Sequence, residues 1–410
     1  MSAPSSAIPQ AASETTRGSA LEVFAVALRL GVTSFGGPIA HLGYFRTEYV
    51  QRRAWLDEAT YADLVALAQL LPGAASSKVG ISIGVLRAGI PGGLAAWLGF
   101  TLPSAIAMVV FALSLQNIGE QAAGWLHGLK IVAVAAVAFA VWGMARNLAW
   151  DRPRGTIALA SAAAILAVPI PSMLVIVALV AGAIGWRFLP APAVESRPHV
   201  HVPLPRWIWV ASAVLYFVFL VGLPVARAIN PSQALALFDS FYRAGALVFG
   251  GGNVVLPLLQ PEVVTPGWVS SDTFLAGYAA AQAVPGPLFT LSAFLGAAMT
   301  PPPNGWAGGT LALIAIFLPS FFLAFVALGT WSLLRSRPAV QATLRGVNAA
   351  VVGVLLAALY TPVITTSIFK PIDAALALVA FAMLAVWRVP PWIVVLVTAA
   401  GGAVIRAIGA

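Results

Sequence analysis

Two related stretches decide the fold of this chain: GVTSFGG at residues 31–37 and GALVFGG at residues 245–251. Both end in Phe-Gly-Gly, and their residue numbers differ by a constant offset of 214 (245 − 31). An arginine stands two positions before each stretch, Arg29 in the first and Arg243 in the second. Self-similarity at a fixed offset is the signature of an internal repeat.

Further landmarks repeat in the same order. They are Trp55 with Trp268, AQLLPG at 68–73 with AQAVPG at 281–286, and LPS at 102–104 with LPS at 318–320. The offset in residue number stays nearly constant, at 213 (268 − 55 and 281 − 68) and then 216 (318 − 102). We therefore interpret the chain as two copies of one domain.

The composition places both copies in a membrane. Of the 410 residues, 60% are hydrophobic and 9% charged, with a mean hydropathy of +0.93, whereas soluble domains carry roughly 25% charged residues. The apolar runs are ~15 to 25 residues long, which favours helical spans over the short alternating strands of a barrel. The composition predicts an all-α polytopic protein embedded in the lipid bilayer.

Charge and cysteine content exclude other classes. The net charge of +9 fits the Lys and Arg excess of cytoplasmic loops. The sequence has no basic stripe interleaved with aromatic residues, so nothing in it indicates nucleic-acid binding. Because the chain has no cysteine, disulfides, thiolate chemistry and iron–sulfur ligation are excluded.

Composition divides the chain into five parts. Residues 1–20 form a Ser/Ala/Pro-rich tail that we expect to be disordered, 21–189 form the first repeat, and 190–206 form a Pro-rich cytoplasmic linker. An extra apolar span at 207–230 precedes the second repeat at 231–410. If each copy crosses the membrane an even number of times, the extra crossing inverts the second copy, which gives the inverted repeats of many secondary transporters.

The arginine distribution supports this inversion. Arg46, Arg52 and Arg53 follow the first Phe-Gly-Gly, whereas the matching segment 258–272 has no Lys or Arg. By the positive-inside rule the first segment is cytoplasmic, like the N-terminus, and the second lies outside.

That topology requires four broken, re-entrant segments that return to the side from which they entered. Gly-Gly-Pro and Pro-Gly interrupt helical hydrogen bonding, which is tolerated at membrane depth only inside protein or beside a wet cavity. Counting the four as re-entrant leaves nine spans, and counting them as crossings gives 13, so both alternatives invert the halves. The four segments are 21–42, 59–88, 233–257 and 273–298.

The Pro-Gly turns are the first candidates for binding chemistry. A helix that starts near the midplane presents free N–H groups and its positive dipole end, which suits an oxyanion. Ser76, Ser77 and Lys78 follow Gly73 in the first copy, whereas Thr290 is the matching polar residue in the second. A site between the copies would then be asymmetric, with more positive charge on the first side. In the alternative interpretation, Pro-Gly only kinks a packed helix.

Intramembrane cations point the same way. Four lie within apolar segments: Arg29, Lys78, Lys130 and Arg243. Each costs roughly 2.5 to 3.5 kcal/mol at the centre of a membrane helix, so a compensating contact is expected. The acids lie nearer the helix ends, which favours a cavity that binds anions. Alternatively, Arg29 and Arg243 snorkel or pair with Glu22 and Asp239.

The remaining candidates flank the breaks. Side-chain amides near the turns can donate to a ligand, but they can equally cap the broken helix ends. The predicted substrate-binding residues are Arg29, Gly36, Gly37, Gln69, Gly73, Ser76, Ser77, Lys78, Arg243, Gly250, Gly251, Asn253, Gln282, Gly286 and Thr290.

Enzyme motifs are missing from the sequence. The four histidines fall in no metal-ligand spacing, and no Gly-x-x-x-x-Gly-Lys-Ser/Thr loop for ATP occurs. We expect no cofactor and no metal. A membrane-embedded enzyme is a remote alternative because no cluster of catalytic acids or histidines is found within the spans.

Together these motifs resemble the two-domain form of the chromate ion transporter family. The resemblance covers about residues 20–400 and rests on Phe-Gly-Gly, Gln-x-x-Pro-Gly and the later Pro-Ser in each copy. It implies a bacterial inner-membrane protein that exports chromate, a tetrahedral oxyanion similar to sulfate, and confers chromate resistance. It also implies that transport uses the membrane potential or the proton gradient.

The first copy departs from the family pattern. Pro72-Gly73-Ala74 replaces the family's Pro-Gly-Pro, and Lys78 stands where a neutral polar residue is expected. The departure bears on which anion is carried, so a transporter or exchanger of sulfate or another oxyanion is the alternative. A homodimer is one possible assembly of this chain.

Overall fold

The computed structural model describes residues 18–118, 123–170, 172–190, 204–249, 252–335 and 337–407. Within these ranges the chain is helical and contains no strand, which confirms the predicted all-α class. The predicted tail up to residue 17, linker residues 191–203, and Gly250 and Gly251 lie outside the described residues.

Polar residues start the helices of the first half. The elements are α1 (Ala20–Thr33), α2 (Gly37–Phe45), the π-helix η1 (Arg46–Arg52), α3 (Glu58–Leu70), α4 (Ala75–Ile118), α5 (Ala123–Leu148), α6 (Arg152–Ala167) and α7 (Met173–Phe188). The Ser19 hydroxyl accepts a hydrogen bond from the Glu22 amide at the start of α1, and the Asp57 carboxylate caps α3 in the same way. Such caps satisfy N–H groups that have no acceptor within the helix.

The second half repeats this arrangement after one additional helix. Its elements are α8 (Arg206–Ile229), α9 (Gln233–Leu247), η3 (Gly252–Val254), α10 (Val255–Val263), α11 (Ser271–Ala283), η4 (Leu288–Thr290), α12 (Leu291–Ala298), α13 (Gly305–Arg335), α14 (Pro338–Ala358), η5 (Leu359–Ile364), α15 (Pro371–Ala385) and α16 (Pro391–Ala407). Ser232 and Ser270 cap α9 and α11. The predicted extra span corresponds to α8.

α4 is a hairpin of two helical arms. Ala88 and Gly89 have non-helical backbone angles, and a Cβ on Gly84 would overlap the carbonyl oxygen of Gly92. In a straight helix two residues eight positions apart would be separated by about 12 Å. The arms therefore fold back on each other at residues 88–89. α12 and α13 repeat this contact through Gly296 and Gly308.

The helix lengths agree with a multi-pass membrane protein. Five helices of the described chain are long and apolar enough to span a bilayer: α4, whose second arm runs from the hairpin to Ile118, α5, α8, α13, and α14 together with η5. α8 is the most exposed of them, with 11% of its most apolar window buried, as expected for a lipid-facing span. α6 and α7, the predicted short hairpin, have 16 residues each, fewer than the ~20 of a typical span.

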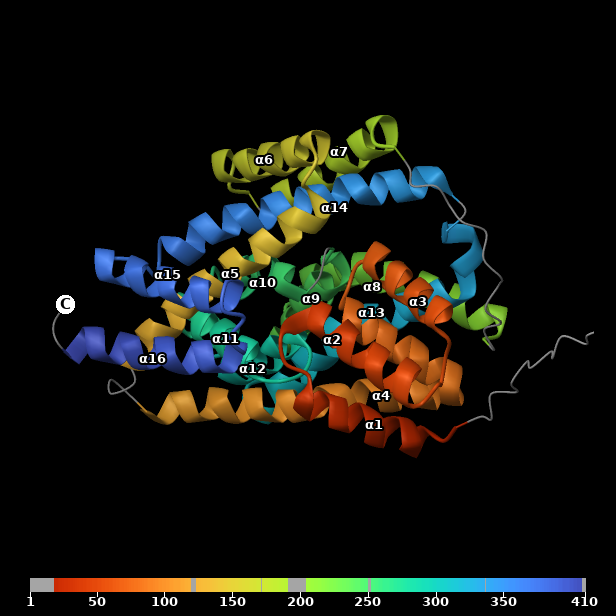
Figure 1. The fold of residues 1–410 in the computed structure, drawn as a ribbon, viewed down its shortest axis with the longest axis horizontal. Helices are drawn as coiled ribbons and strands as arrows, with labels where there is room; N and C mark the ends of the chain where they lie inside the picture. The colour runs from red at the N-terminus through yellow and green to blue at the C-terminus, as the bar shows by residue number, and fades with distance from the viewer. Residues whose placement is uncertain are drawn as a thin grey trace, which may run out of the picture.

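The C-terminal helices of each half pack against a long helix of the other half. α14 packs along α6 and α7, and α5 packs along α15 and α16. Figure 1 shows α6, α7 and α14 on one side of the molecule and α1 and α4 on the opposite side, with α9 to α12 between them. The broken helices of the second half thus lie between these outer helices.

The broken helices of the first half begin and end at one end of the molecule. Glu22, near the start of α1, pairs with Arg87, at the end of the first α4 arm (3.3 Å). The Arg87 guanidinium lies 5.1 Å from the ring centre of Trp55, between η1 and α3. Arg46 at the start of η1 pairs with Glu58 at the start of α3. Each broken segment therefore returns to the end where it started.

The second half has an equivalent end. The Thr300 amide, after α12, donates to the carbonyl oxygen of Trp268, between α10 and α11 (3.1 Å). The Trp268 ring lies 5.9 Å from the guanidinium of Arg227, near the end of α8. The broken helices of this half also begin and end together.

Candidate functional site

Four breaks interrupt the helices, two in each copy. In the first copy they lie at 34–36, between α1 and α2, and at 71–74, between α3 and α4. In the second copy they follow α9 and, at 284–287, α11. These are the Phe-Gly-Gly and Pro-Gly segments that the sequence analysis identified.

Each Pro-Gly turn is bonded to the other copy. The Gly73 amide donates to the carbonyl oxygen of Val248 (2.6 Å), and the Gly286 amide donates to the carbonyl oxygen of Ser34 (3.0 Å). Val248 and Ser34 are matched positions of the two Phe-Gly-Gly segments. The two hydrogen bonds are therefore reciprocal, and they bring the breaks of both copies together.

Close packing makes glycine necessary at both turns. Gly73 and Gly286 each have a φ of +100°, and a Cβ at these positions would lie 2.8 Å from Ser320 Oγ and 2.7 Å from Ser104 Oγ, respectively. The Ala74 amide donates to the same Ser320 hydroxyl (3.1 Å). Backbone groups inside a membrane need protein partners, and here the opposite copy supplies them. Three amides that were predicted to face an anion thus have acceptors within the protein.

Lys78 lies at the first Pro-Gly turn. Its side chain is 1% exposed, and its ammonium donates to the carbonyl oxygens of Leu71 (2.5 Å) and Pro72 (2.8 Å). These carbonyls lie in the break that follows α3, where no helical N–H reaches them. Lys78 makes no ion pair with the described residues, so its positive charge has no counter-charge among them.

Two of the other predicted cations are neutralised by acids. Arg243 donates to Asp239 (2.8 and 3.0 Å) and to Glu262 (3.0 Å), as the pairing alternative predicted for Asp239. Lys130 pairs with Asp272 (3.0 Å). The pairing alternative is wrong for Arg29, since Glu22 pairs with Arg87 instead.

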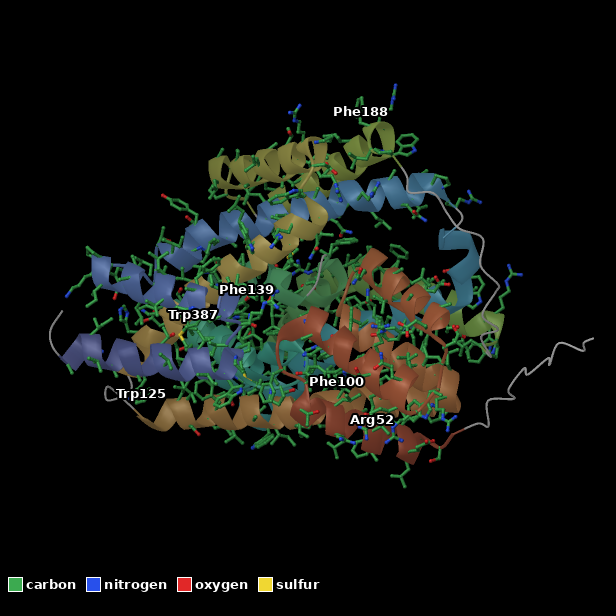
Figure 2. The ribbon with its side chains drawn as sticks, viewed as in Figure 1. Arg52, Phe100, Trp125, Phe139, Phe188 and Trp387 are labelled. Carbon is green, nitrogen blue, oxygen red and sulfur yellow. The ribbon has the colours of Figure 1, made fainter. Side chains whose placement is uncertain are left out.

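Arg29 lines a polar cavity of about 580 Å³ in the first copy. Arg52 lies in the same cavity and bonds to Glu48 (2.8 Å), which also accepts from Arg53 (2.8 Å). Two arginines and one carboxylate line this cavity, and Arg53 shares that carboxylate, so the cavity has excess positive charge. Figure 2 shows Arg52 beside α1 and α4, at the first copy's side of the molecule. The other lining residues are Leu30, Thr33, Ala40, Gly43, Tyr44 and Thr47.

The second copy has a matching cavity of about 440 Å³, but there the charges are balanced. Arg243 and Arg227 face Asp239 and Glu262, and α7 and α14 contribute to its lining. Seven lining positions recur at the offset of the Phe-Gly-Gly segments: Arg29, Leu30, Thr33, Ala40, Tyr44, Thr47 and Glu48 match Arg243, Ala244, Leu247, Val254, Leu258, Pro261 and Glu262.

The sequence analysis did not identify Glu48, Arg52 or Glu262 as cavity residues. The available signal was an arginine followed by a glutamate at the same spacing in both copies, Arg29 with Glu48 and Arg243 with Glu262.

The remaining predicted residues lie around the breaks. Gly36 and Gly37 form the first break with positive φ, and Gln69 is exposed on α3. Gln282 donates to Asn253 (3.4 Å), and the Thr290 hydroxyl donates to the Pro287 carbonyl oxygen (2.9 Å). Ser76 lies 3.4 Å from a His41 ring nitrogen. Through these contacts Gln282 holds the Asn253 side chain, and Thr290 binds the backbone of the second Pro-Gly turn.

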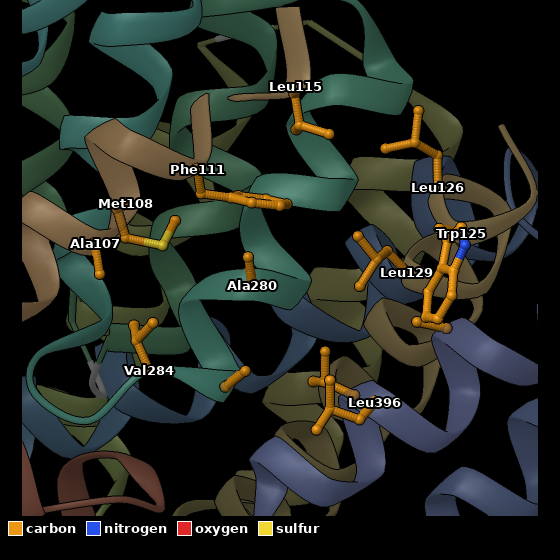
Figure 3. Close-up of a pocket in the computed structure, with 13 residues that line it drawn as sticks. Ala107, Met108, Phe111, Leu115, Trp125, Leu126, Leu129, Ala280, Val284 and Leu396 are labelled. Atoms are coloured by element: carbon orange, nitrogen blue, oxygen red, sulfur yellow. The ribbon is translucent and has the colours of Figure 1, made fainter. Parts of the chain in front are cut away.

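An apolar cavity of about 630 Å³ lies beside the second copy's Pro-Gly break. Figure 3 shows its lining side chains, which include Met108 and Phe111 from α4, Leu129 from α5 and Val284 next to Pro285. Such a lining suits hydrocarbon rather than an anion.

Fold and site together define a multi-pass membrane protein in which broken helices of two copies meet at the centre, an arrangement found in many secondary transporters. The chain belongs to the chromate transporter family, whose sequence model matches residues 21–186 and 235–403. The two matched regions correspond to the two predicted repeats.

Several known proteins are similar to this chain in sequence. The chain is 26% identical over 344 residues to the chromate transport protein of Pseudomonas aeruginosa, covering 82% of this chain and 79% of the relative. It is 28% identical over 367 residues to the chromate transport protein of Cupriavidus metallidurans, covering 87% and 86%. The uncharacterized transporter YwrA of Bacillus subtilis is 36% identical over 110 residues, 26% of this chain and 60% of the relative. No solved structure matches the chain.

Proposed function

We propose that this protein is a secondary active transporter that exports chromate, or a closely similar divalent oxyanion, across the bacterial inner membrane and thereby confers chromate resistance. The observation that carries the proposal is the positively charged cavity of Arg29 and Arg52 next to the break at 34–36, in a member of the chromate transporter family. Relatives covering more than three quarters of the chain are named chromate transport proteins.

The proposed orientation places the N-terminus in the cytoplasm and inverts the second copy. Leu204, just before α8, packs against the first copy's core, whereas Arg227 near the α8 end pairs with Asp239 of the second copy. A helix of 24 residues is about 36 Å long, so α8 connects ends that lie a membrane thickness apart. Arginines 46, 52, 53 and 87 gather at the first end, which the positive-inside rule assigns to the cytoplasm.

In the proposed cycle the cavity of Arg29 and Arg52 receives the cytoplasmic anion. The two guanidinium groups attract a dianion, and the Thr33 and Thr47 hydroxyls supply neutral donors in the same cavity. The anion then passes between the interlocked breaks to the second copy's side. The inside-negative membrane potential favours this direction for a dianion.

The test is uptake of labelled chromate into energised inverted vesicles from cells that express the chain. We expect accumulation that persists in excess sulfate and falls about ten-fold or more in Arg29→Ala at equal expression, because a charge-assisted contact contributes roughly 1.5 to 3 kcal/mol. Glu58→Gln, which removes an exposed ion pair, is the matched control.

Either of two outcomes changes the proposal. Wild-type vesicles that fail to accumulate chromate would refute chromate export by this chain. Accumulation that sulfate abolishes would favour the second candidate function, transport of sulfate or another oxyanion, because tetrahedral dianions offer the same oxygen acceptors to this cavity.

A further inference from the structure

We propose that the anion loses its water in a buried polar cluster of the first copy, and that His41 binds it there. The inference rests on the proposed function and specifies its binding site. The cluster, called the His41 cluster below, consists of Ser34, His41, Ser76, Ser77 and Thr101.

The first argument is that the cluster holds polar atoms without partners. Ser34, His41, Ser77 and Thr101 are each at most 3% exposed. Within the described structure, the three hydroxyls and the His41 Nε2 make no hydrogen bond of normal geometry, although the His41 ring lies close to the Ser34 backbone. Leaving such a group unpaired costs roughly 1 to 3 kcal/mol, and native proteins avoid that cost unless the group serves a ligand or water.

The second argument is that the segments carrying the cluster meet around the His41 ring. His41 on α2 contacts Ser76 Oγ at the start of α4 (3.4 Å), and its ring packs edge-on against Phe100 of the second α4 arm (5.3 Å). The Ser34 backbone bonds to Gly286 (3.0 Å), where a Cβ would lie 3.2 Å from the Phe100 carbonyl oxygen. Ser77 and Thr101 are the chain neighbours of Ser76 and Phe100. The cluster therefore adjoins the interlocked breaks.

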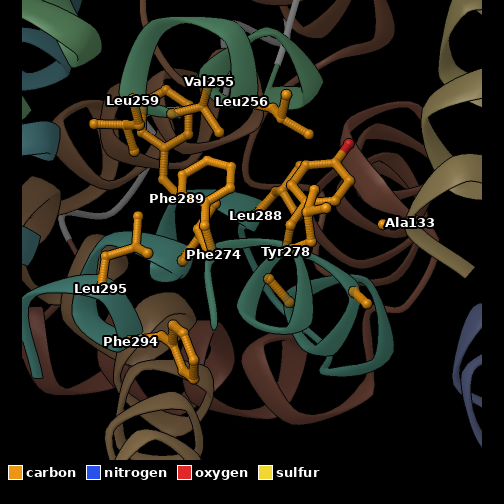
Figure 4. Packing of buried hydrophobic residues seen from close by; sticks show 14 of the residues in the cluster. Ala133, Val255, Leu256, Leu259, Phe274, Tyr278, Leu288, Phe289, Phe294 and Leu295 are labelled. Carbon is orange, nitrogen blue, oxygen red and sulfur yellow. The ribbon is translucent and has the colours of Figure 1, made fainter. Parts of the chain in front are cut away.

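The third argument comes from the second copy, where the same positions are almost entirely apolar. Figure 4 shows Val255 and Phe289, the counterparts of His41 and Ser76, packed with Leu256 and Leu259. Only the Ser77 counterpart, Thr290, is polar, and its hydroxyl is bonded to Pro287. The matched residues are Ser34 with Val248, His41 with Val255, Ser76 with Phe289, Ser77 with Thr290, and Thr101 with Phe317. The scaffold alone therefore does not require polar residues at these positions.

The fourth argument is charge. Lys78 directly follows Ser77, is buried, and makes no ion pair with the described residues. Its counterpart is Leu291. A buried cation without a counter-charge is unfavourable at membrane depth, and a bound dianion supplies that counter-charge. No carboxylate belongs to the cluster, so its donors suit an oxyanion rather than a cation.

The cluster also has an approach route. Thr33 and Ala40, which precede Ser34 and His41 in the chain, line the positively charged cavity of Arg29 and Arg52. A Cβ added to Gly37, the first residue of α2, would meet no atom within 4 Å. An anion attracted to the cavity is thus next to the cluster. If the Ser76 hydroxyl donates to His41 Nδ1, the Nε2 carries the proton that the anion accepts.

The test measures binding directly. The full-length protein in lipid nanodiscs is titrated with chromate and with sulfate, and half-maximal thermal stabilisation gives the affinity. The variants His41→Val and Ser77→Ala remove one donor each, and Ser292→Ala is the control because its buried hydroxyl bonds only to the Phe289 carbonyl oxygen in the second copy. His41→Asn restores an N–H donor and is expected to recover part of the affinity.

We expect about ten-fold weaker chromate or sulfate binding in His41→Val and in Ser77→Ala, with the Ser292→Ala affinity unchanged. Should His41→Val fail to fold, Thr101→Val, which keeps the side-chain shape, replaces it and should weaken binding in the same way. Folded cluster variants that bind both anions with wild-type affinity would overturn the inference while leaving transport intact. Wild-type protein that neither binds nor transports chromate or sulfate would refute the proposed function as well.

Discussion

At the scale of single residues, the junction between the copies depends on two glycines. Gly73 and Gly286 combine a φ of +100° with an amide bonded to the opposite copy. A side chain at either position would have to displace a serine hydroxyl of the other copy. These residues therefore tie local backbone conformation to the assembly of the two halves.

Gly286→Ala is expected to destabilise the protein by about 2 kcal/mol or more, because left-handed backbone costs about 1 to 2 kcal/mol for a residue with a Cβ and the added atom would lie 2.7 Å from Ser104 Oγ. Gly143→Ala, in α5 with open space around its Cβ position, is the control and should leave stability unchanged or slightly raised. Thermal unfolding in detergent measures both. Equal melting temperatures for the two variants would contradict this account.

A second residue-scale prediction concerns the buried carboxylate of Asp239. It is 1% exposed and bonds to Arg243 and Arg227, so Asp239→Asn leaves two guanidinium groups undercompensated. We expect a loss of roughly 3 to 5 kcal/mol, against less than about 1 kcal/mol for Glu58→Gln at the exposed pair. Denaturation curves of the two variants decide between these values, and similar losses would show that Asp239 does not act as a buried counter-charge.

At the scale of elements, the π-helix η1 distinguishes one part of the first copy from the matching part of the second. The offset in residue number is 214 at the Phe-Gly-Gly segments (245 − 31) and 213 at Trp55 (268 − 55), so the first copy is longer by a single position between them. η1 lies in this interval, whereas α10 is a regular helix in the second copy. A π-helical turn accommodates a single inserted residue and is frequent at functional sites. Here it carries Glu48 and Arg52 into the first cavity.

The contact between α7 and α14 has a testable role, which is to cover the second cavity. A Cβ on Gly346 would overlap the carbonyl oxygen of Ala181, so Gly346→Val should push α7 away from α14 and open the second cavity. Because the chain has no cysteine, Leu247→Cys reports on that cavity and its counterpart Thr33→Cys on the first. Maleimide labelling is expected to accelerate several-fold at 247 and not at 33. Unchanged labelling at 247 would show that this crossing does not cover the cavity.

At the scale of the whole molecule, the two cavities are related by the repeat but differ in charge and cover. The first is polar with excess arginine, and the second is charge-balanced and lined in part by α7 and α14. In the proposed inverted arrangement the two related cavities open at opposite ends, as alternating access requires.

The proposed inversion of the second copy makes a prediction about sidedness. Ala59→Cys, in the first turn of α3, should react with a membrane-impermeant maleimide only from the cytoplasmic side, and Thr265→Cys, between α10 and α11, only from the outside. Both positions are exposed, so access depends on the membrane rather than on burial. Labelling of intact cells and of inverted vesicles tests this, and labelling of both positions from one side would refute the inversion.

The amino-acid sequence by itself determined the all-α membrane class, the duplication and the location of the four breaks, because these follow from hydropathy, self-similarity and Gly/Pro chemistry along the chain. The tertiary structure decided which residues form hydrogen bonds and ion pairs with each other. The Gly73 amide meets Val248 of the other copy, and Arg243 meets Glu262 on another helix, and such long-range contacts arise only when the helices pack. Unpaired polar atoms such as those of the His41 cluster are likewise defined by what surrounds them, so only the folded chain reveals them.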